Sequence, residues 1–383
     1  MSRALDPNAI AALKTGNHQK VFDEIADVFT YAHNPQITAR PCLIEIEILS
    51  GFGFDPSNNV LRDQNAVAVP KLRLVQAFFV ARGILQQLRE PSPAGSDSNS
   101  SGEQIHRATA VCLLMDAENL TAANMRKRLI TRQLASVSTA ASTSDATSAH
   151  NIAPTIVSLL RREKWLLDSL LTSRLHRHTK SPTLWNHRRW LLKLLWLHGL
   201  EKDVDTAQDL LDVVCVSGER HARNYYAWSH ARWVVRNFQY VTEKLVEIAK
   251  SWAWKHHTDI SGWSFLLFVL ELHNKLALSV YRDTLRLTES LQWRNESVWW
   301  FLRTVSAGRL LSDDRETLEQ AREAFVCLGT RLFEDDVEHM GDKREEGKRH
   351  EDSVKGAGCD RAREVWERAK TWVEKYRDLP NMA

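Results

Sequence analysis

Six histidines stand at spacings that suggest metal binding: His176, His178, His187, His230, His256 and His257. Imidazole is a common zinc ligand, and a zinc site takes four protein ligands, or three with one open position. Neither a carboxylate nor a cysteine completes such a set in these segments. The sequence therefore predicts structural or surface roles for these histidines, and no metal bound by this chain.

Cysteines and short motifs give no sign of a self-contained active site. The five cysteines are widely spaced and form no CxxC pair, which fits a reducing, cytoplasmic compartment. The chain contains no GxGxxG, GxxxxGK(S/T), HExxH or GxSxG motif. Because it also has no signal-peptide pattern and no apolar stretch of about 18 residues, we expect no transmembrane segment.

Charge is balanced over the chain as a whole. Lys and Arg number 51 against 48 Asp and Glu, a formal net charge of +3. Basic clusters at residues 126–128, 161–162 and 174–180 offer an RNA-binding or lipid-binding alternative, but acidic runs such as residues 334–336 offset them. We interpret the clusters as solvated faces and expect no nucleic-acid partner.

The N-terminal part of the chain shows the least regular pattern of apolar residues. Residues 1–102 are expected to form an N-terminal region with helices at 20–31 and 70–88. Alternating apolar and charged residues at 41–49 predict a short strand or extended arm. Residues 90–102, rich in Ser, Pro and Gly, are expected to be a flexible linker.

From residue 103 the apolar spacing is helical, and nothing indicates a strand. Residues 103–333 form the second predicted region, in which the low-complexity stretch 135–150 predicts a disordered insertion. Residues 334–383 complete the chain as a charged loop, to about residue 360, and a capping helix at 361–376.

Tryptophan marks an internal repeat in the helical region. Of the 14 Trp residues, 12 lie between Trp165 and Trp300. Two segments share a capping residue four positions before a Trp, His two after it, Arg four after it and a second Trp five after it. Their residues are Ser181, Trp185, His187, Arg189 and Trp190 in one, and Asn224, Trp228, His230, Arg232 and Trp233 in the other.

Weaker copies are anchored at Trp263 and Trp299, and an earlier one at Ala123. Successive anchors are 62, 43, 35 and 36 residues apart, and the shorter spacings are typical of helical-hairpin repeats. The sequence therefore predicts an all-α fold, an α-α superhelix in which hairpins form a right-handed crescent, with a short irregular N-terminal arm.

Each motif position has a physical role. The capping residue accepts hydrogen bonds from exposed backbone N–H groups, and the Trp is buried between neighbouring hairpins. Arg189 and Arg232 return to the face beside their own Trp. Residues 204–216, 241–254 and 276–291 are expected to supply the second helix of each hairpin.

The copies resemble the repeat of protein prenyltransferase α subunits, in which an Asn-Tyr-x-x-Trp-x-x-Arg-Arg pattern recurs. Asn224-Tyr225-Tyr226-Ala227-Trp228 is close to that pattern. The segment from Lys180 to Trp190, with Arg40-Pro41-Cys42, is similar to a divergent branch, the protein prenyltransferase α-subunit repeat-containing proteins. The resemblance covers roughly residues 40–305.

This resemblance implies an enzyme subunit. Such subunits wrap around a β subunit that holds the catalytic zinc and the isoprenoid diphosphate, and the divergent branch pairs with a Rab-type geranylgeranyltransferase β subunit. The implied reaction transfers a geranylgeranyl group to a cysteine thiolate of a protein substrate such as a SNARE or small GTPase. The resemblance implies no cofactor on this chain.

The same resemblance implies the site residues. Lys180, five residues before Trp185, matches a family lysine that reaches toward the diphosphate, and an ammonium suits the charge on that leaving group. The alternative is a solvent-exposed lysine at a hairpin turn. Pro182 replaces a family tyrosine, which puts peptide contacts from that position in doubt.

Arg223, Tyr225 and Tyr226 are the matching candidates before Trp228. A basic residue and two phenols there suit the same diphosphate-binding cavity, but aromatic residues at helical spacing more often serve the core. Tyr226 stands where the family commonly has His. Because Ala stands at anchor position 123, Pro182 replaces a family tyrosine and the last two copies are weak, a non-enzymatic helical-repeat adaptor remains the alternative function.

Overall fold

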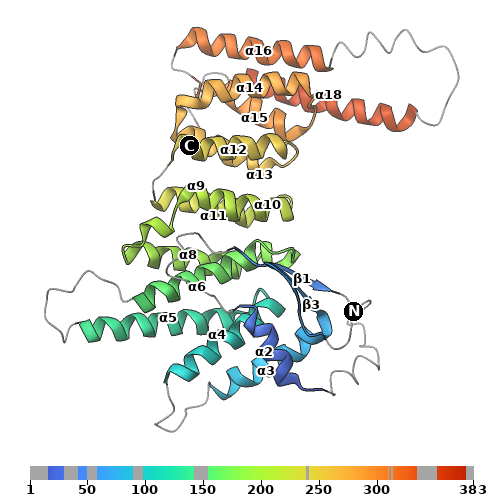
Figure 1. Cartoon of the computed structure of the whole chain (residues 1–383). Helices are drawn as coiled ribbons and strands as arrows, with labels where there is room; N and C mark the ends of the chain where they lie inside the picture. Colours follow the sequence, from blue (N-terminus) through green and yellow to red (C-terminus); the bar gives the residue numbers. More distant parts are fainter. Residues whose placement is uncertain are drawn as a thin grey trace. The chain divides into compact units, whose positions relative to one another are not determined.

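The computed structural model describes residues 16–29, 42–49, 58–88, 98–141, 154–238, 241–308, 310–311, 314–333 and 352–376. These residues are mostly helical, with one small sheet near the N-terminus (Figure 1). The chain divides into two compact units, the first comprising residues 1–205 and 212–230 and the second residues 206–211 and 231–383.

The N-terminal region contains a sheet where the sequence predicted an irregular arm. Helix α2 (His18–Asp27) precedes strands β1 (Glu45–Leu49), β2 (Leu61–Asp63) and β3 (Ala66–Pro70), and helix α3 (Lys71–Gln87) follows. The strand order is β1-β3-β2, with β1 parallel and β2 antiparallel to β3. The predicted helices and the strand at 41–49 are confirmed, whereas β2 and β3 are a correction.

A tight turn explains the two missed strands. Gln64 has φ 52°, in the left-handed region that short polar turns use. The flanking residues are too few to show a strand period, since β2 has three residues and β3 five. Buried Ile46, Val67 and Val69 give the sheet its apolar side.

Helices α4 (Ser98–Met115), α5 (Leu120–Ala141) and α6 (Pro154–Leu171) follow in the first unit. The predicted linker and insertion are partly wrong, because helix α4 already begins at residue 98 and α5 continues to residue 141. Both segments contain alanine or polar residues, which are compatible with extending a helix that is already formed next to them in the sequence. Residues 89–97 and 142–153 lie outside the described residues.

The first unit continues through α7 (His176–Thr179), α8 (Pro182–Leu197), η1 (Glu201–Asp203), the π-helical segment η2 (Leu210–Cys215) and α10 (Val216–Arg220), into α11 (Tyr225–Phe238). Most of η2 and the start of α11 belong to the first unit, and short helix α9 (Thr206–Asp209) to the second. The second-helix prediction at 204–216 is thus realised as three short helical pieces.

The second unit contains α12 (Glu243–Lys255), α13 (Ile260–Leu272), η3 (Asn274–Leu276), α14 (Ala277–Ser290), α15 (Glu296–Ala307), α16 (Arg315–Phe333) and α18 (Asp352–Lys375). Helices α12 and α14 confirm the predicted second helices. The final helix is confirmed but begins at residue 352, so the predicted loop is wrong for residues 352–360; residues 334–351 lie outside the described residues.

Every copy of the motif starts a helix with a side-chain cap. The residue four positions before the anchor accepts from a backbone N–H two or three residues later, and these caps are Asn119, Ser181, Asn224, Asp259 and Asn295. An N-cap of this kind is worth about 1 kcal/mol to helix stability. The caps explain why each helix begins where it does.

The anchors themselves are core residues. Trp185, Trp228, Trp263 and Trp299 are at most 1% exposed, as residues that pack between helices must be. In three copies the indole N–H donates to the carbonyl six residues earlier, at 2.9 Å each: Trp185 to Thr179, Trp263 to His257 and Trp299 to Trp293. One side chain thus ties the turn before the helix to the helix itself.

Among the described residues, no single helix is both long and apolar enough to cross a bilayer, although the bent pair Ile260–Leu272 and Asn274–Ser290 meets both requirements together.

Candidate functional site

Two turns that precede Trp helices lie against each other in the first unit. They comprise residues 172–181, which include α7, and residues 220–224, and we call them the paired turns. The rings of His176 and His221 are 3.8 Å apart, centroid to centroid. The side chain of Asn224 donates to the carbonyl oxygen of Thr179 at 2.8 Å. Candidates that are 43 residues apart in sequence are thereby brought together.

The carbonyl oxygen of Thr179 holds the paired turns. It accepts from the indole of Trp185 at 2.9 Å, from Asn224 at 2.8 Å and from the hydroxyl of Ser217 at 3.3 Å. Thr179 and Asn224 are both almost fully buried, so these bonds are shielded from water. Three elements, α8, α10 and α11, are therefore fixed to one backbone atom.

Lys180 follows this carbonyl directly and precedes the cap Ser181. The hydroxyl of Ser181 donates to the carbonyl of Ala117 at 2.9 Å and accepts from Leu184 N at 3.0 Å. The backbone on both sides of Lys180 is thus held, whereas this half-buried residue forms no ion pair within the described part of the chain. A held backbone with an available cation suits binding of an anionic group.

Arg223 occupies the same position before the next cap. It is exposed and has φ 55°, a left-handed conformation that costs a non-glycine residue about 1–2 kcal/mol. Asn224 compensates, because its amide also donates to Ser217 Oγ at 2.9 Å while its oxygen caps α11. Backbone strain held in this way is often found at binding sites.

Tyr225 and Tyr226 are not core residues. Their side chains are 71% and 38% exposed, and their rings meet edge to face at 5.7 Å. The preferred packing prediction is therefore wrong, because the first turn of α11 directs both rings away from the buried face that carries Trp228. They remain available, beside Arg223, to contact a ligand or a partner.

The arginines four residues after the anchor connect neighbouring copies. Arg189 donates to Ser229 at 3.1 Å in the first unit, and Arg232 donates to Ser264 at 2.7 Å in the second. Burial lowers the pKa of Arg189, and the nearby Tyr225 opposes that shift. Both side chains therefore reach the next copy rather than serving their own Trp alone.

The second tryptophans of the two clear copies are only partly buried. Trp190 meets His187 at 5.5 Å and lies under the ammonium of Lys127 at 5.7 Å. Trp233 packs edge to face with Phe238 at 5.7 Å. Each ring closes the edge of its own helix, in line with the predicted packing role.

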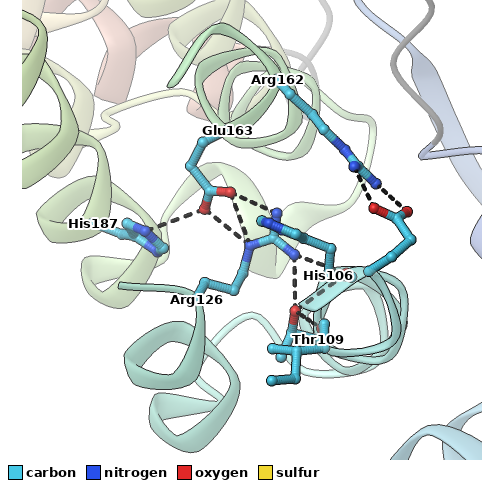
Figure 2. A network of polar contacts seen from close by, with 8 residues as sticks. His106, Thr109, Arg126, Arg162, Glu163 and His187 are labelled. Atoms are coloured by element: carbon cyan, nitrogen blue, oxygen red, sulfur yellow. Dashed lines mark hydrogen bonds and ion pairs between the residues drawn. The ribbon is translucent and has the colours of Figure 1, made fainter. Parts of the chain in front are cut away.

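A buried polar network lies beneath the first two copies (Figure 2). The guanidinium of Arg126 binds Glu163 through Nε and Nη2, at 2.6 to 3.1 Å, and through Nη1 donates to Thr109 Oγ1 and to the carbonyl of His106. His187 Nε2 lies 3.2 Å from Glu163 Oε1. All five side chains are at most 4% exposed.

Charge in this network is set by one ion pair. Burial alone raises the pKa of Glu163, but Arg126 outweighs burial and holds that pKa at about 2. Burial lowers the pKa values of His106 and His187 to about 4 each. At neutral pH the network therefore contains one carboxylate, one guanidinium and two uncharged imidazoles.

A second buried ion pair joins the second and third copies. Arg188 Nε donates to Asp168 at 2.7 Å, and Arg188 Nη1 lies 2.7 Å from His230 Nε2. Because a guanidinium only donates, this imidazole nitrogen accepts. Burial, together with Arg188, keeps the pKa of His230 well below its usual range. The ring of His230 also packs on Trp185 at 4.8 Å.

These buried pairs are not predicted from the sequence. The expectation of a solvated face is wrong for Arg126, which is 1% exposed, and Arg188 rather than Arg189 is the fully buried arginine of its copy. A signal for both is present in the aligned repeat copies, because Arg126 and Arg188 each stand three residues after the anchor of their copy. Arg161 and Arg162, from another basic cluster, pair with Asp203 and Glu103.

Metal binding finds no support in the side-chain arrangement. Across the described ranges, no group of three or more His, Cys, Asp or Glu residues is placed to hold a metal ion. His178 Nε2 donates to Leu113 O at 2.9 Å, and His187 and His230 belong to the buried pairs.

Comparison with known families agrees with this geometry. Residues 169–195, which include the first of the paired turns and most of α8, match the protein prenyltransferase alpha subunit repeat. The chain carries a protein prenyltransferase alpha subunit repeat. Residues 184–291 match the ECM9 middle domain. Comparison with curated proteins gives no match to this chain.

Proposed function

We propose that this chain is the α-type subunit of a heterodimeric protein prenyltransferase of the geranylgeranyltransferase kind. The observation that supports the proposal is the prenyltransferase alpha subunit repeat at residues 169–195, which coincides with the turn that holds Lys180. The capped helices continue the same construction beyond that repeat, and we propose that they form a curved α-α solenoid. Its concave face is the natural seat for a catalytic β subunit.

In this proposal the chemistry is shared between two chains. The β subunit, of the Rab geranylgeranyltransferase type, holds zinc and the isoprenoid diphosphate, and the complex is cytoplasmic. A cysteine of the protein substrate, such as a SNARE or small GTPase, loses its thiol proton to solvent. Its sulfur forms a bond to C1 of the geranylgeranyl group while the C1–O bond breaks, and diphosphate leaves with the electron pair.

Lys180 and Arg223 are the residues of this chain proposed to face the diphosphate. Negative charge grows on the leaving group as the C1–O bond breaks, so cations held at that point stabilise the transition state more than the ground state. The fixed backbone around Thr179 and Ser181 allows Lys180 to act without reorganisation. Tyr225 and Tyr226, both exposed, are proposed to contact the diphosphate or the substrate protein.

The test is reconstitution. The full chain is coexpressed with prenyltransferase β subunits, and copurification and transfer of a geranylgeranyl group to a cysteine-containing protein are measured. Lys180→Ala is expected to lower kcat by about 100- to 1,000-fold with pairing intact. Lys202→Ala is the matched control, because exposed Lys202 lies beyond the other end of α8, roughly 24 Å along the helix. Pairing with no β subunit, or an unchanged rate in Lys180→Ala, contradicts the proposal.

A second candidate function is a helical-repeat adaptor without a role in transfer. The ECM9 middle-domain match extends over more of the chain than the prenyltransferase repeat does. The buried arginine three residues after the anchor is also replaced in later copies, by Ala231, Leu266 and Leu302. A stable complex with a β subunit that shows no transfer activity, or a complex with other proteins alone, would favour the adaptor.

A further inference from the structure

A side chain of the N-terminal sheet, that of Glu45, contacts both of the paired turns. Glu45, the first residue of β1, lies with Oε1 3.1 Å from Arg220 Nη2 and with Oε2 3.8 Å from Arg174 Nη2. Arg174 belongs to the first of the paired turns, six residues before Lys180, and Arg220 to the second, three residues before Arg223. A single carboxylate therefore reaches both turns from a third element.

Glu45 is held at this place by its backbone. Its N–H donates to Asn65 O at 2.9 Å, and its Cα pairs with Ala66 in the parallel register of β1 and β3. The preceding Ile44 N–H donates to buried Ser169 Oγ at 3.1 Å, which attaches the strand to α6. The carboxylate thus extends from a fixed backbone rather than from a loose arm.

A second bond attaches the segment before the strand. The indole of Trp165, on α6, donates to the carbonyl of Cys42 at 2.9 Å. Trp165 and Ser169 are four residues apart, on the same face of α6. Their two hydrogen bonds attach the segment 42–44 to that helix. The N-terminal sheet is therefore fastened to the helix that leads directly into the first of the paired turns.

The ion pairs of Glu45 contribute little to the free energy of unfolding, so its role lies in where it holds the two arginines. The side chains of Glu45, Arg174 and Arg220 are 43%, 63% and 20% exposed, and ion pairs so accessible to water contribute about 0–1 kcal/mol to stability. Beside the buried bonds to the Thr179 carbonyl that already join the paired turns, one carboxylate shared by two arginines adds a further link between the turns that carry Arg174 and Arg220. The paired turns also carry the cations Arg177, Lys180 and Arg223, so repulsion between like charges favours their separation.

We infer that β1 is a clasp on the paired turns and that Glu45 is a positioning residue for Lys180 and Arg223. The clasp acts together with the bonds to the Thr179 carbonyl and restricts the motion of the two basic turns, so that both cations meet one anionic group. The catalytic consequence rests on the proposed function, whereas the clasp itself does not.

The sign of the effect separates positioning from simple electrostatics. Glu45→Gln removes one negative charge beside a basic surface, which by charge alone strengthens attraction for a diphosphate. Positioning predicts the opposite, because the separated turns no longer present Lys180 and Arg223 together. Glu47→Gln is the matched control, since it makes the same charge change two residues along β1, at an exposed site with no ion pair in the described structure.

The first experiment measures amide hydrogen exchange in the full chain alone. Glu45→Gln is expected to speed exchange at residues 172–181 and 217–224, with Glu47→Gln like the unmodified chain. Glu45→Arg combined with Arg220→Glu is expected to restore slow exchange at residues 217–224. Unchanged exchange in Glu45→Gln overturns the clasp, and this measurement needs no partner, so it decides the matter even where the proposed function fails.

The second experiment uses the reconstituted heterodimer with geranylgeranyl diphosphate. Glu45→Gln is expected to lower kcat/KM, by up to about 100-fold as for misplaced catalytic groups, whereas Glu47→Gln leaves it unchanged. The charge-reversed pair is expected to recover part of the loss. Faster exchange together with unaltered or higher kcat/KM in Glu45→Gln overturns the positioning role.

Discussion

The two units build the same repeated helix around different interiors. In the first, Arg126 and Arg188 stand three positions after the anchors Ala123 and Trp185, His187 and His230 stand two after Trp185 and Trp228, and all four are buried. In the second, the same positions hold Phe265 and Phe301, and Leu266 and Leu302, also buried. The residue two after one anchor packs on the preceding Trp in both units: His230 on Trp185 at 4.8 Å, and Phe301 on Trp263 at 5.0 Å. Cap and Trp therefore determine the frame, and the interior chemistry is free to change within it.

The largest expected effect comes from removing the buried ion pair in the interior of the first unit. Glu163→Gln leaves the guanidinium of Arg126 buried without a counter-charge, which is expected to cost about 3–5 kcal/mol in the free energy of unfolding. Denaturant unfolding measures it. Glu103→Gln is the control, because its pair with Arg162 is partly exposed and its loss is expected to cost less than about 1 kcal/mol. Equal costs for the two variants would mean that burial does not distinguish these pairs.

The next effect is a selective sensitivity of the first unit to acid. Unfolded imidazoles take up protons below pH 6.5, whereas His106 and His187 stay neutral in the fold until about pH 4, so stability falls as pH drops between these values. Each histidine contributes about 1.4 kcal/mol per pH unit there. Exchange protection of α4, α5 and α8 is expected to fall between pH 7 and pH 5, and His187→Gln to weaken that dependence. A loss of exchange protection confined to the second unit would show that the second unit, and not the first, is sensitive to acid.

The smallest effect tests the aromatic interior of the second unit. A Cβ at Gly329 would overlap the ring of Trp366, which packs on Trp299 at 5.3 Å. Gly329→Ala is expected to destabilise by about 1–3 kcal/mol and to expose α18 to exchange. Gly83→Ala, in open space on α3, is the control and is expected to stabilise by about 0.5–1 kcal/mol. Destabilisation by both variants, or by neither, would indicate that the contact with Trp366 does not limit packing.

Local signals predicted the frame of the molecule. The caps and the buried tryptophans were evident because a cap and its Trp are four residues apart, within one helical turn. The final helix followed from Trp366, Ala369 and Val373, which share one face and are all buried. In each case the determinants lie close together in sequence, where periodicity carries information.

Contacts between segments far apart in the sequence could not be predicted from the sequence. Arg126 and Glu163 are 37 residues apart and Glu45 and Arg220 are 175 apart, and neither spacing has a local signature. The exposure of Tyr225 depends on which neighbours cover the first turn of α11, which a single helix does not specify. The candidate site was predicted as a set of residues, but the partners that hold its turns were not.

The carbonyl of Thr179 has a consequence for mutational tolerance. Its three donors meet a main-chain oxygen, so exchanging the side chain at position 179 or 180 leaves the acceptor in place. Substitutions at Asn224 or Trp185, by contrast, remove a donor that no neighbour replaces. The surface at Lys180 can therefore change its chemistry through single substitutions without loss of the scaffold, and new binding preferences can arise there at little risk to folding.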